Sequence, residues 1–190
     1  MAKPKPPPFV VLCDTREQTP PPLPPGCVYE RKLLKEGDYS TPALEMIARI
    51  ERKSATDFAS TLSWGRERFE RELERLRAFR WKAIVVESDL SLVYRCTAMT
   101  PASILGSIAS LYARWDCPVL FAANEAGCGR LMAGILLRWQ RRIEAEVAQS
   151  ALEAGSPHPG PDAAGLPPSV AEPTPHALAE LTATADRVLP

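Results

Sequence analysis

The chain has 190 residues, enough for one domain with a substantial core, and its 45% hydrophobic and 24% charged residues are typical of globular proteins. The formal net charge is zero, but residues 1–142 carry 22 basic and 16 acidic side chains, a net of +6, which suits a polyanionic partner. No apolar run approaches a membrane span, and Phe9–Leu12 is too short for a signal-peptide core. We therefore expect no membrane association and a soluble intracellular protein, in the cytoplasm or nucleoid, or in a host cytoplasm if the source is viral.

The cysteines and histidines exclude several classes of site. The five cysteines are scattered and form no CxxC pair, so we expect reduced thiols packed in or near strands rather than a zinc site. Both histidines, His158 and His176, lie in a Pro-rich C-terminal region. Their absence elsewhere argues against Ser-His-Asp hydrolases, HNH-type nucleases and His-ligated zinc enzymes. Catalysis must then rely on carboxylates, Lys, Arg, Tyr or Cys.

The first third of the chain is predicted to be rich in strands. Residues 1–8 are rich in Pro and Lys, which predicts an extended, disordered leader. Residues 18–26, with five prolines and a glycine, predict an irregular loop, and Glu36–Tyr39 predicts a turn into an extended segment. The expected strands are Phe9–Cys13, which ends at Asp14, Val28–Leu34 and Met46–Lys53.

Helices and strands are predicted to alternate in the rest of the chain. Ser54 is the expected N-cap of a helix that reaches Leu62, with Asp57 at its third position. The later elements expected are a helix at Arg66–Arg80 with an apolar stripe, a strand at Ala83–Glu87, a helix at Pro101–Trp115 capped by Thr100, a strand at Pro118–Ala122, and a helix from Glu125 to about Leu152. This order predicts an α/β domain over residues 9–152, with a mixed central sheet flanked by helices.

The C-terminal segment has a different composition. Residues 155–175 contain seven prolines and three glycines, so we expect residues 153–190 to form a Pro/Ala-rich, acidic and largely disordered tail. Such a tail could recruit a protein partner.

The pattern that carries the most chemistry joins Gly37-Asp38-Tyr39 to Glu51-Arg52-Lys53. Glu51 and Lys53 are two residues apart on a predicted strand and so point to the same face. If Asp38 ends a neighbouring strand, it can share a divalent cation with Glu51, while Lys53 positions or deprotonates a water molecule. This indicates metal-dependent hydrolysis of phosphodiesters. The alternative is an ordinary turn and a solvated strand end, because D…ExK is a common pattern in charged proteins.

Further candidates flank this pattern. Asp14-Thr15-Arg16-Glu17 directly follows the first strand. It is either a turn with local hydrogen bonds to Asp14, or a site where Asp14 binds metal or water and Arg16 binds a phosphate. In the helix at 66–80 the arginines are most simply a solvated face, but Arg66 and Arg68 at its N-terminal end are candidates for contacts with a DNA backbone.

Taken together, these blocks resemble the nuclease domain of the XPF family of structure-specific DNA endonucleases, in a stand-alone form. The hallmark is a strand ending in D-x-R-E followed by G-D…E-R-K-x-x-x-D, which stands here as Asp14–Glu17, Gly37-Asp38, Glu51-Arg52-Lys53 and Asp57. The resemblance spans about residues 9–142. It implies a restriction-endonuclease-like α/β fold of the PD-(D/E)XK type. It also implies an endonuclease that uses Mg²⁺ or Mn²⁺ and cuts branched DNA, such as flaps and forks, in repair, recombination or replication.

The resemblance also implies roles for single residues. Asp38 and Glu51 would bind the metal with Asp14 as a further acidic member, Lys53 would orient or activate the water, and Arg52 and Asp57 would complete the motif. Nuclease domains of this family commonly form dimers, and the helices at Pro101–Trp115 and Gly129–Trp139 have apolar faces that suit a homodimer.

Three alternatives stay open at this stage. A non-catalytic XPF-like subunit would bind DNA and dimerise with an active partner, although such members typically lose the acidic and lysine positions that this chain keeps. A Holliday-junction resolvase or restriction-type nuclease would apply the same chemistry to DNA of another shape. A generic α/β ligand-binding domain is disfavoured, because the sequence has no Gly-rich phosphate loop.

Overall fold

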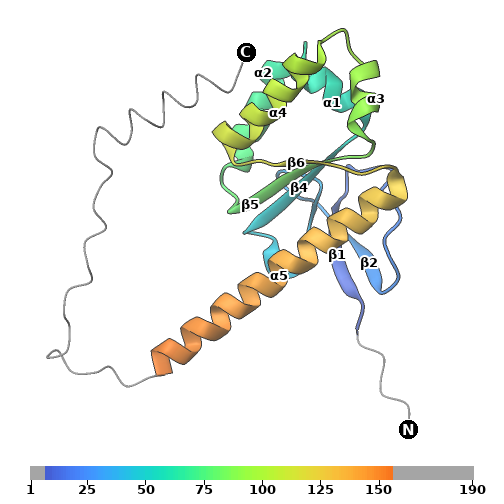
Figure 1. Cartoon of the computed structure of the whole chain (residues 1–190). Coiled ribbons are helices and arrows are strands. Elements are labelled where there is room, and N and C mark those ends of the chain that lie inside the picture. Colours follow the sequence, from blue (N-terminus) through green and yellow to red (C-terminus); the bar gives the residue numbers. More distant parts are fainter. Residues whose placement is uncertain (1–6, 156–190) are drawn as a thin grey trace, which may run out of the picture. The chain divides into compact units, whose positions relative to one another are not determined.

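A computed structural model describes residues 7–155, and Figure 1 shows its helices and strands. The strands are β1 (Phe9–Asp14), β2 (Cys27–Lys32), β3 (Tyr39–Ser40), β4 (Ala48–Lys53), β5 (Trp81–Val86) and β6 (Val119–Phe121). The helices are α1 (Ala55–Leu62), α2 (Arg66–Leu76), α3 (Leu90–Arg95), α4 (Pro101–Trp115) and α5 (Glu125–Gly155), with a short 3₁₀ turn at Pro42–Leu44. The predicted leader (1–8) and tail (153–190) lie for the most part outside the described residues.

The strands form one mixed sheet in the order β2-β1-β3-β4-β5-β6. The short strand β3 is antiparallel to both β1 and β4, whereas all other neighbours are parallel. In this register Tyr39 pairs with Cys13 on one side and with Ile50 on the other. The residue before β3, Asp38, therefore lies between the carboxyl ends of β1 and β4. The predicted α/β fold with a mixed central sheet is confirmed.

The two faces of the sheet pack against different helices, which Figure 1 shows as α1–α4 on one side and α5 on the other. Side chains alternate along β5, so Ile84 and Val86 join a core with α1–α4, while Val85 joins a core with α5. On the α5 side, Met132 and Leu136 are fully buried. The sheet is therefore covered on both faces, and the side chains of functional interest lie where its strands end.

Most local predictions agree with the structure, because they rest on capping signals. Ser54 caps α1 by accepting a hydrogen bond from the backbone N–H of Asp57, and Thr100 caps α4 at its predicted start. Helix α2 ends at Leu76, four residues before the predicted Arg80. Beyond its end, Phe79 packs against the same core as Leu73 and Leu76 and lies under the guanidinium of Arg49, whose centre is 4.4 Å from the centre of the ring. The short helix α3, which the sequence prediction missed, is capped by Asp89.

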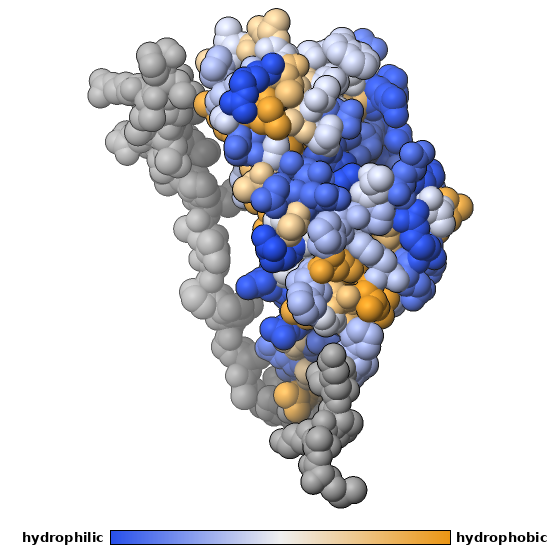
Figure 2. Space-filling model, turned by 90° about the vertical axis from the view of Figure 1, so that its right-hand side faces the viewer, coloured by the Kyte–Doolittle hydropathy of each residue, from blue (hydrophilic) through white to orange (hydrophobic). Residues whose placement is uncertain are grey.

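The cysteines are free thiols, as predicted, and Cys13, Cys117 and Cys128 are buried. Burial raises the pKa of Cys13 to about 11 and those of Cys117 and Cys128 to about 12, so these three are packing residues rather than nucleophiles. Among the described residues, no helix combines the length and apolar character that a membrane span needs. The face in Figure 2 is largely hydrophilic, with its hydrophobic residues in small separate groups.

Candidate active site

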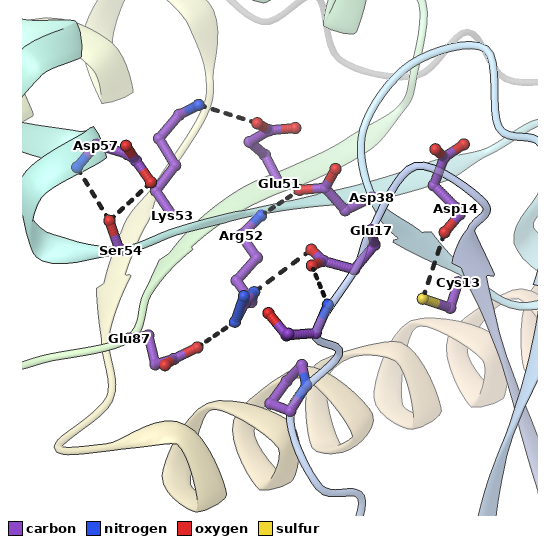
Figure 3. Close-up of polar contacts among 12 residues, drawn as sticks. Cys13, Asp14, Glu17, Asp38, Glu51, Arg52, Lys53, Ser54, Asp57 and Glu87 are labelled. Carbon is purple, nitrogen blue, oxygen red and sulfur yellow. Dashed lines mark hydrogen bonds and ion pairs between the residues drawn. The ribbon is translucent and has the colours of Figure 1, made fainter.

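Asp38, Glu51 and Lys53 lie together in a cavity of about 420 Å³ between the carboxyl end of β4 and helices α1 and α2 (Figure 3). A second hollow of about 240 Å³ also contains Asp38 and Glu51 and extends along α2. The structure thus brings together the two blocks that the sequence analysis singled out, from segments that are separated by the whole of β3 and its turn.

Gly37 sets the backbone direction that leads into Asp38. Its φ of +67° lies in the left-handed region, where an L side chain is strained. A Cβ at this position would also lie 3.2 Å from the Cβ of Arg49 and 3.3 Å from the carbonyl oxygen of Ile50. Only glycine fits this turn without displacement, which explains the Gly-Asp pair in physical terms.

Asp38 is held against β4 through both its backbone and its side chain. Its N–H donates to the Ile50 carbonyl at 2.9 Å, and its Oδ2 accepts from the Arg52 N–H at 2.8 Å. Its own carbonyl accepts from the Asp14 N–H at 2.8 Å. These bonds fix the Asp38 carboxylate beside Glu51 and tie it to both neighbouring strands.

Asp38 and Glu51 form a pair of poorly hydrated carboxylates. Burial raises the pKa of Asp38 to about 6. The pKa of Glu51, a residue only 7% exposed, is raised well above its ordinary value by burial and by the negative charge of Asp38. Two such carboxylates facing one cavity repel each other, and a cation between them would relieve that repulsion.

Lys53 is the positive charge of this group. Its Nζ lies 2.9 Å from Glu51 Oε1 and 3.7 Å from Glu72 Oε2, and 5.1 Å from the centre of the Phe69 ring. Burial alone would lower the pKa of Lys53, but the charges of Glu51 and Glu72 outweigh it and raise the pKa. The structure therefore holds Lys53 as an ammonium ion. Glu72, on α2, was missed by the sequence analysis.

Arg52 points to the opposite side of β4 from Glu51 and Lys53 (Figure 3). Its Nε lies 3.5 Å from Glu17 Oε2, and its Nη1 donates to Glu87. The Arg52 side chain is only 15% exposed. These ion pairs connect the end of β4 to the segment after β1 and to the segment after β5, which gives Arg52 a structural role. Arg52 also lines the larger cavity, and the DNA contact expected of it stays a prediction.

Asp14 is almost fully buried, at 1% exposed, and does not line either cavity. Its Oδ1 accepts from the N–H and Nε of Arg16, at 2.8 and 2.7 Å, and its Oδ2 accepts from the Leu34 N–H at 2.6 Å. Burial favours the neutral acid, but these bonds outweigh it and lower the pKa of Asp14. The carboxylate thus positions Arg16, which lines both cavities.

Asp57 lines the larger cavity and lies in the first turn of α1, next to the N-cap Ser54. Its Oδ2 accepts from the Ser54 hydroxyl at 2.7 Å, and its N–H donates to the same hydroxyl at 3.0 Å. The last acid of the motif therefore fixes the start of the helix that follows β4.

The two candidate DNA-binding arginines of α2, Arg66 and Arg68, line different hollows of the structure. Arg68 lines both cavities, whereas Arg66 pairs with Glu70 at 3.3 Å and lines a different, small hollow next to α4. Three basic residues that the sequence analysis missed line the smaller cavity with Arg16 and Arg68, namely Lys35, Arg71 and Arg75. Arg71 and Arg75 could have been predicted from the sequence, because positions 68, 71 and 75 share one helical face.

The donor set fits a hard divalent cation. Within residues 7–155, no cluster of three or more His, Cys, Asp or Glu side chains has the arrangement of a metal site. The Asp38 and Glu51 carboxylates nevertheless face one cavity with room for water. Mg²⁺ is commonly held by one or two carboxylates and completes its shell with waters and substrate phosphate oxygens.

This fold, with paired carboxylates and a lysine where its central strands end, is that of an XPF-type nuclease domain. The family model for the ERCC4 domain matches residues 14–135, and the chain belongs to this family of structure-specific DNA nucleases. The predicted resemblance is thereby confirmed. No match was found among curated proteins.

Two of the solved structures that are similar to the chain are of XPF from Aeropyrum pernix. One is "XPF from Aeropyrum pernix, complex with DNA", which is 25% identical with a TM-score of 0.58, and the match covers 70% of this chain and 66% of that one. The other is "XPF from Aeropyrum pernix", with 23% identity, a TM-score of 0.57, and coverage of 76% of this chain and 71% of that one. The second shows the fold alone.

Proposed function

We propose that this protein is a Mg²⁺- or Mn²⁺-dependent endodeoxyribonuclease that hydrolyses phosphodiester bonds near branches in DNA. One observation carries the proposal: the carboxylates of Asp38 and Glu51 face a common cavity beside the ammonium group of Lys53. The similar structure of the A. pernix protein in complex with DNA supports DNA as the substrate.

In this proposal Asp38 and Glu51 hold the metal ion. When bound, the cation would neutralise charge on the phosphate oxygens and lower the pKa of a coordinated water. The Lys53 ammonium orients the attacking water or a phosphate oxygen, while Glu51 and Glu72 fix its position. Asp14, predicted as a further acidic member of the metal site, acts through Arg16 instead, because three protein donors already bind its two oxygens.

The basic residues beside the cavity provide a path for the DNA backbone. Arg16 and Arg68 contact phosphates next to the scissile bond, and Lys35 and Arg71 extend this path along the smaller cavity. Such contacts position the DNA without reading its sequence. A nuclease that selects DNA by shape requires this kind of binding.

We also propose a homodimer that forms through α4. Leu105 and Tyr112 are seven residues apart on this helix and are 49% and 62% exposed. The segment Gly129–Trp139 of α5, the other candidate from the sequence, packs on the sheet of its own chain. Light scattering at several concentrations should show a dimer that Tyr112→Asp dissociates, whereas Val147→Asp, at an exposed position on α5, leaves it intact.

The natural setting follows from the substrate. A nuclease of branched DNA acts where repair, recombination or replication takes place, inside a cell. Recruitment of a protein partner by the acidic tail stays a prediction, since residues 156–190 lie outside the described part of the chain.

The decisive experiment is cleavage of labelled flap, fork, four-way-junction, duplex and single-stranded DNA in Mg²⁺, Mn²⁺ or EDTA. We expect metal-dependent cutting of branched substrates that Glu51→Gln abolishes and that Glu30→Gln, a change on an exposed part of β2, leaves unchanged. Preference for four-way junctions would indicate the resolvase alternative. Binding without cleavage of any substrate would favour the non-catalytic subunit and refute the proposal.

A further inference from the structure

Trp64 is an unusual residue, because its indole is 87% exposed. The three other tryptophans of the chain are packed: Trp115 is 8% exposed, and Trp81 and Trp139 stack on each other with ring centres 6.0 Å apart. Trp is highly buried on average, since its large apolar surface gains most from leaving water. An indole held almost wholly in solvent is therefore a candidate for contact with a ligand.

The turn that carries Trp64 is fixed rather than loose. The N–H groups of Ser63 and Gly65 both donate to the Ser60 carbonyl, at 3.2 and 2.9 Å, and the Ser63 hydroxyl donates to the Ala59 carbonyl at 3.0 Å. Gly65 packs so closely that a Cβ there would lie 3.0 Å from the Ser60 oxygen. Both neighbours of Trp64 are thus held in place, and the turn presents the indole to solvent at a defined position.

The position of this turn indicates the kind of ligand. Trp64 lines the same cavity as Asp38, Glu51 and Lys53, and Arg68 lines it from the first turns of α2. An aromatic face next to cationic side chains is the arrangement with which proteins bind single-stranded nucleic acid: bases stack on the ring while phosphates contact the cations. The charged surroundings of Trp64 disfavour an apolar protein segment as the occupant.

We propose that Trp64 is a stacking platform for an unpaired base of single-stranded DNA that leads to the scissile phosphate. The inference rests on the proposed function, because it takes DNA as the substrate and the Asp38–Glu51 cavity as the place of cleavage. In this role Trp64 recognises the single-stranded arm of a branched substrate, because both faces of a base within a duplex are covered by the neighbouring bases.

Tryptophan fluorescence tests this directly, because Trp64 is the most exposed of the four indoles. In EDTA, which prevents metal-dependent cleavage, oligo(dT) should quench the fluorescence, and an oligomer of abasic sites of equal length should not. Trp64→Ala should weaken oligo(dT) binding by about 5- to 150-fold, the range measured for loss of one stacked base. Trp64→Phe should restore much of the affinity but show no quenching.

Met46→Ala is the matched control, because Met46 is 82% exposed and lies outside the cavity. It should bind oligo(dT) as the wild type does, and circular dichroism should show that all variants are folded. Equal quenching by the two oligomers, or unchanged affinity in Trp64→Ala, would overturn the inference.

The cleavage assay separates this inference from the proposed function. Metal-dependent cutting of branched DNA with no effect of Trp64→Ala on binding or cutting would refute the stacking role and leave the nuclease proposal standing. Base-dependent quenching by Trp64 in a protein that cuts none of the substrates would support the stacking role and refute the nuclease proposal.

Discussion

The side chains of Glu51 and Lys53 point to one side of β4, whereas that of Arg52, between them in the chain, points to the other side, although Arg52 also contributes to the lining of the larger cavity (Figure 3). Both sets of side chains form ion pairs with little exposure to solvent, but with different connections. Lys53 pairs with Glu51 on its own strand and with Glu72 on α2, while Arg52 pairs with Glu17 and Glu87 on two other segments of the chain. Because side chains alternate along a strand, three consecutive charged residues contribute to the candidate active site on one face of β4 and to ion pairs with neighbouring segments on the other.

This comparison predicts that changes on the two faces separate activity from stability. On the cavity face the carboxylates of Asp38 and Glu51 repel each other, so neutralising one of them relieves repulsion. On the other face the single cation neutralises two acids, so removing it leaves both uncompensated.

Asp38→Asn is expected to have the largest effect on activity. The amide oxygen can still accept the Arg52 N–H, so the local backbone is kept while one of the two proposed metal ligands loses its charge. Loss of such electrostatic stabilisation should reduce the cleavage rate by at least about 10²- to 10³-fold. The urea midpoint should be unchanged or higher, because two carboxylates no longer repel each other.

Single-turnover cleavage and urea unfolding on the same preparation test this prediction. Near wild-type cutting would remove Asp38 from the proposed metal site. A fall in stability as large as that in activity would place the residue with the structural set.

Arg52→Ala is expected to have the largest effect on stability. It removes the only cation that Glu17 and Glu87 share in the described structure, and breaking a buried ion pair costs about 3 kcal/mol or more. Urea unfolding should show this loss, with Arg52→Met as a control that keeps the packing of the aliphatic stem but not the charge. If both variants are as stable as wild type but bind DNA weakly, Arg52 contacts DNA, as the sequence pattern suggested.

The positions of most helices and of the motif blocks could be predicted from the sequence, because their signals are local. Thr100 before Pro101 and Ser54 before Asp57 are caps that need no tertiary context. The pairing of Asp38 with Glu51 depends on β3, which has only two residues and therefore no hydrophobic period to read. Here the family resemblance supplied what the pattern could not.

The direction of side chains was harder to predict than their identity. Strand periodicity places the side chains of Arg52 and Lys53 on opposite faces of β4, although the two residues are adjacent in the motif. The burial of Asp14 depends on the Leu34 N–H, which is twenty residues away in the chain and marked by no pattern. Trp64 carried a visible signal, since it lies between two predicted helices, but its exposure depends on the fold of that turn.

Gly37→Ala should have an intermediate effect on both stability and activity, because this glycine sets the backbone turn that leads into Asp38. A left-handed backbone costs an L residue about 1–2 kcal/mol, and the contact with Arg49 adds to this. Gly106→Ala on α4 is the matched control, because a Cβ there meets nothing within 4 Å and alanine favours a helix by about 1 kcal/mol. We expect Gly37→Ala to lower both stability and cleavage, and Gly106→Ala to raise stability alone. A Gly37→Ala variant as stable as the wild type would show that the turn relaxes without cost.

Arg68→Ala and Arg66→Ala should have the smallest effects of these variants. The difference between them tests where the DNA backbone lies relative to α2. The two arginines are two residues apart on α2, and only Arg68 lines the cavities. Loss of one phosphate contact should weaken binding of all DNA sequences alike and reduce the slope of log K against log salt by about 1. Arg66→Ala should leave this slope unchanged, because the structure pairs that residue with Glu70. Fluorescence anisotropy in EDTA over a series of salt concentrations measures both slopes. A reduced slope for Arg66→Ala would place the DNA on the α4 side of α2, away from the carboxylates, and the proposed path along the cavity would be wrong.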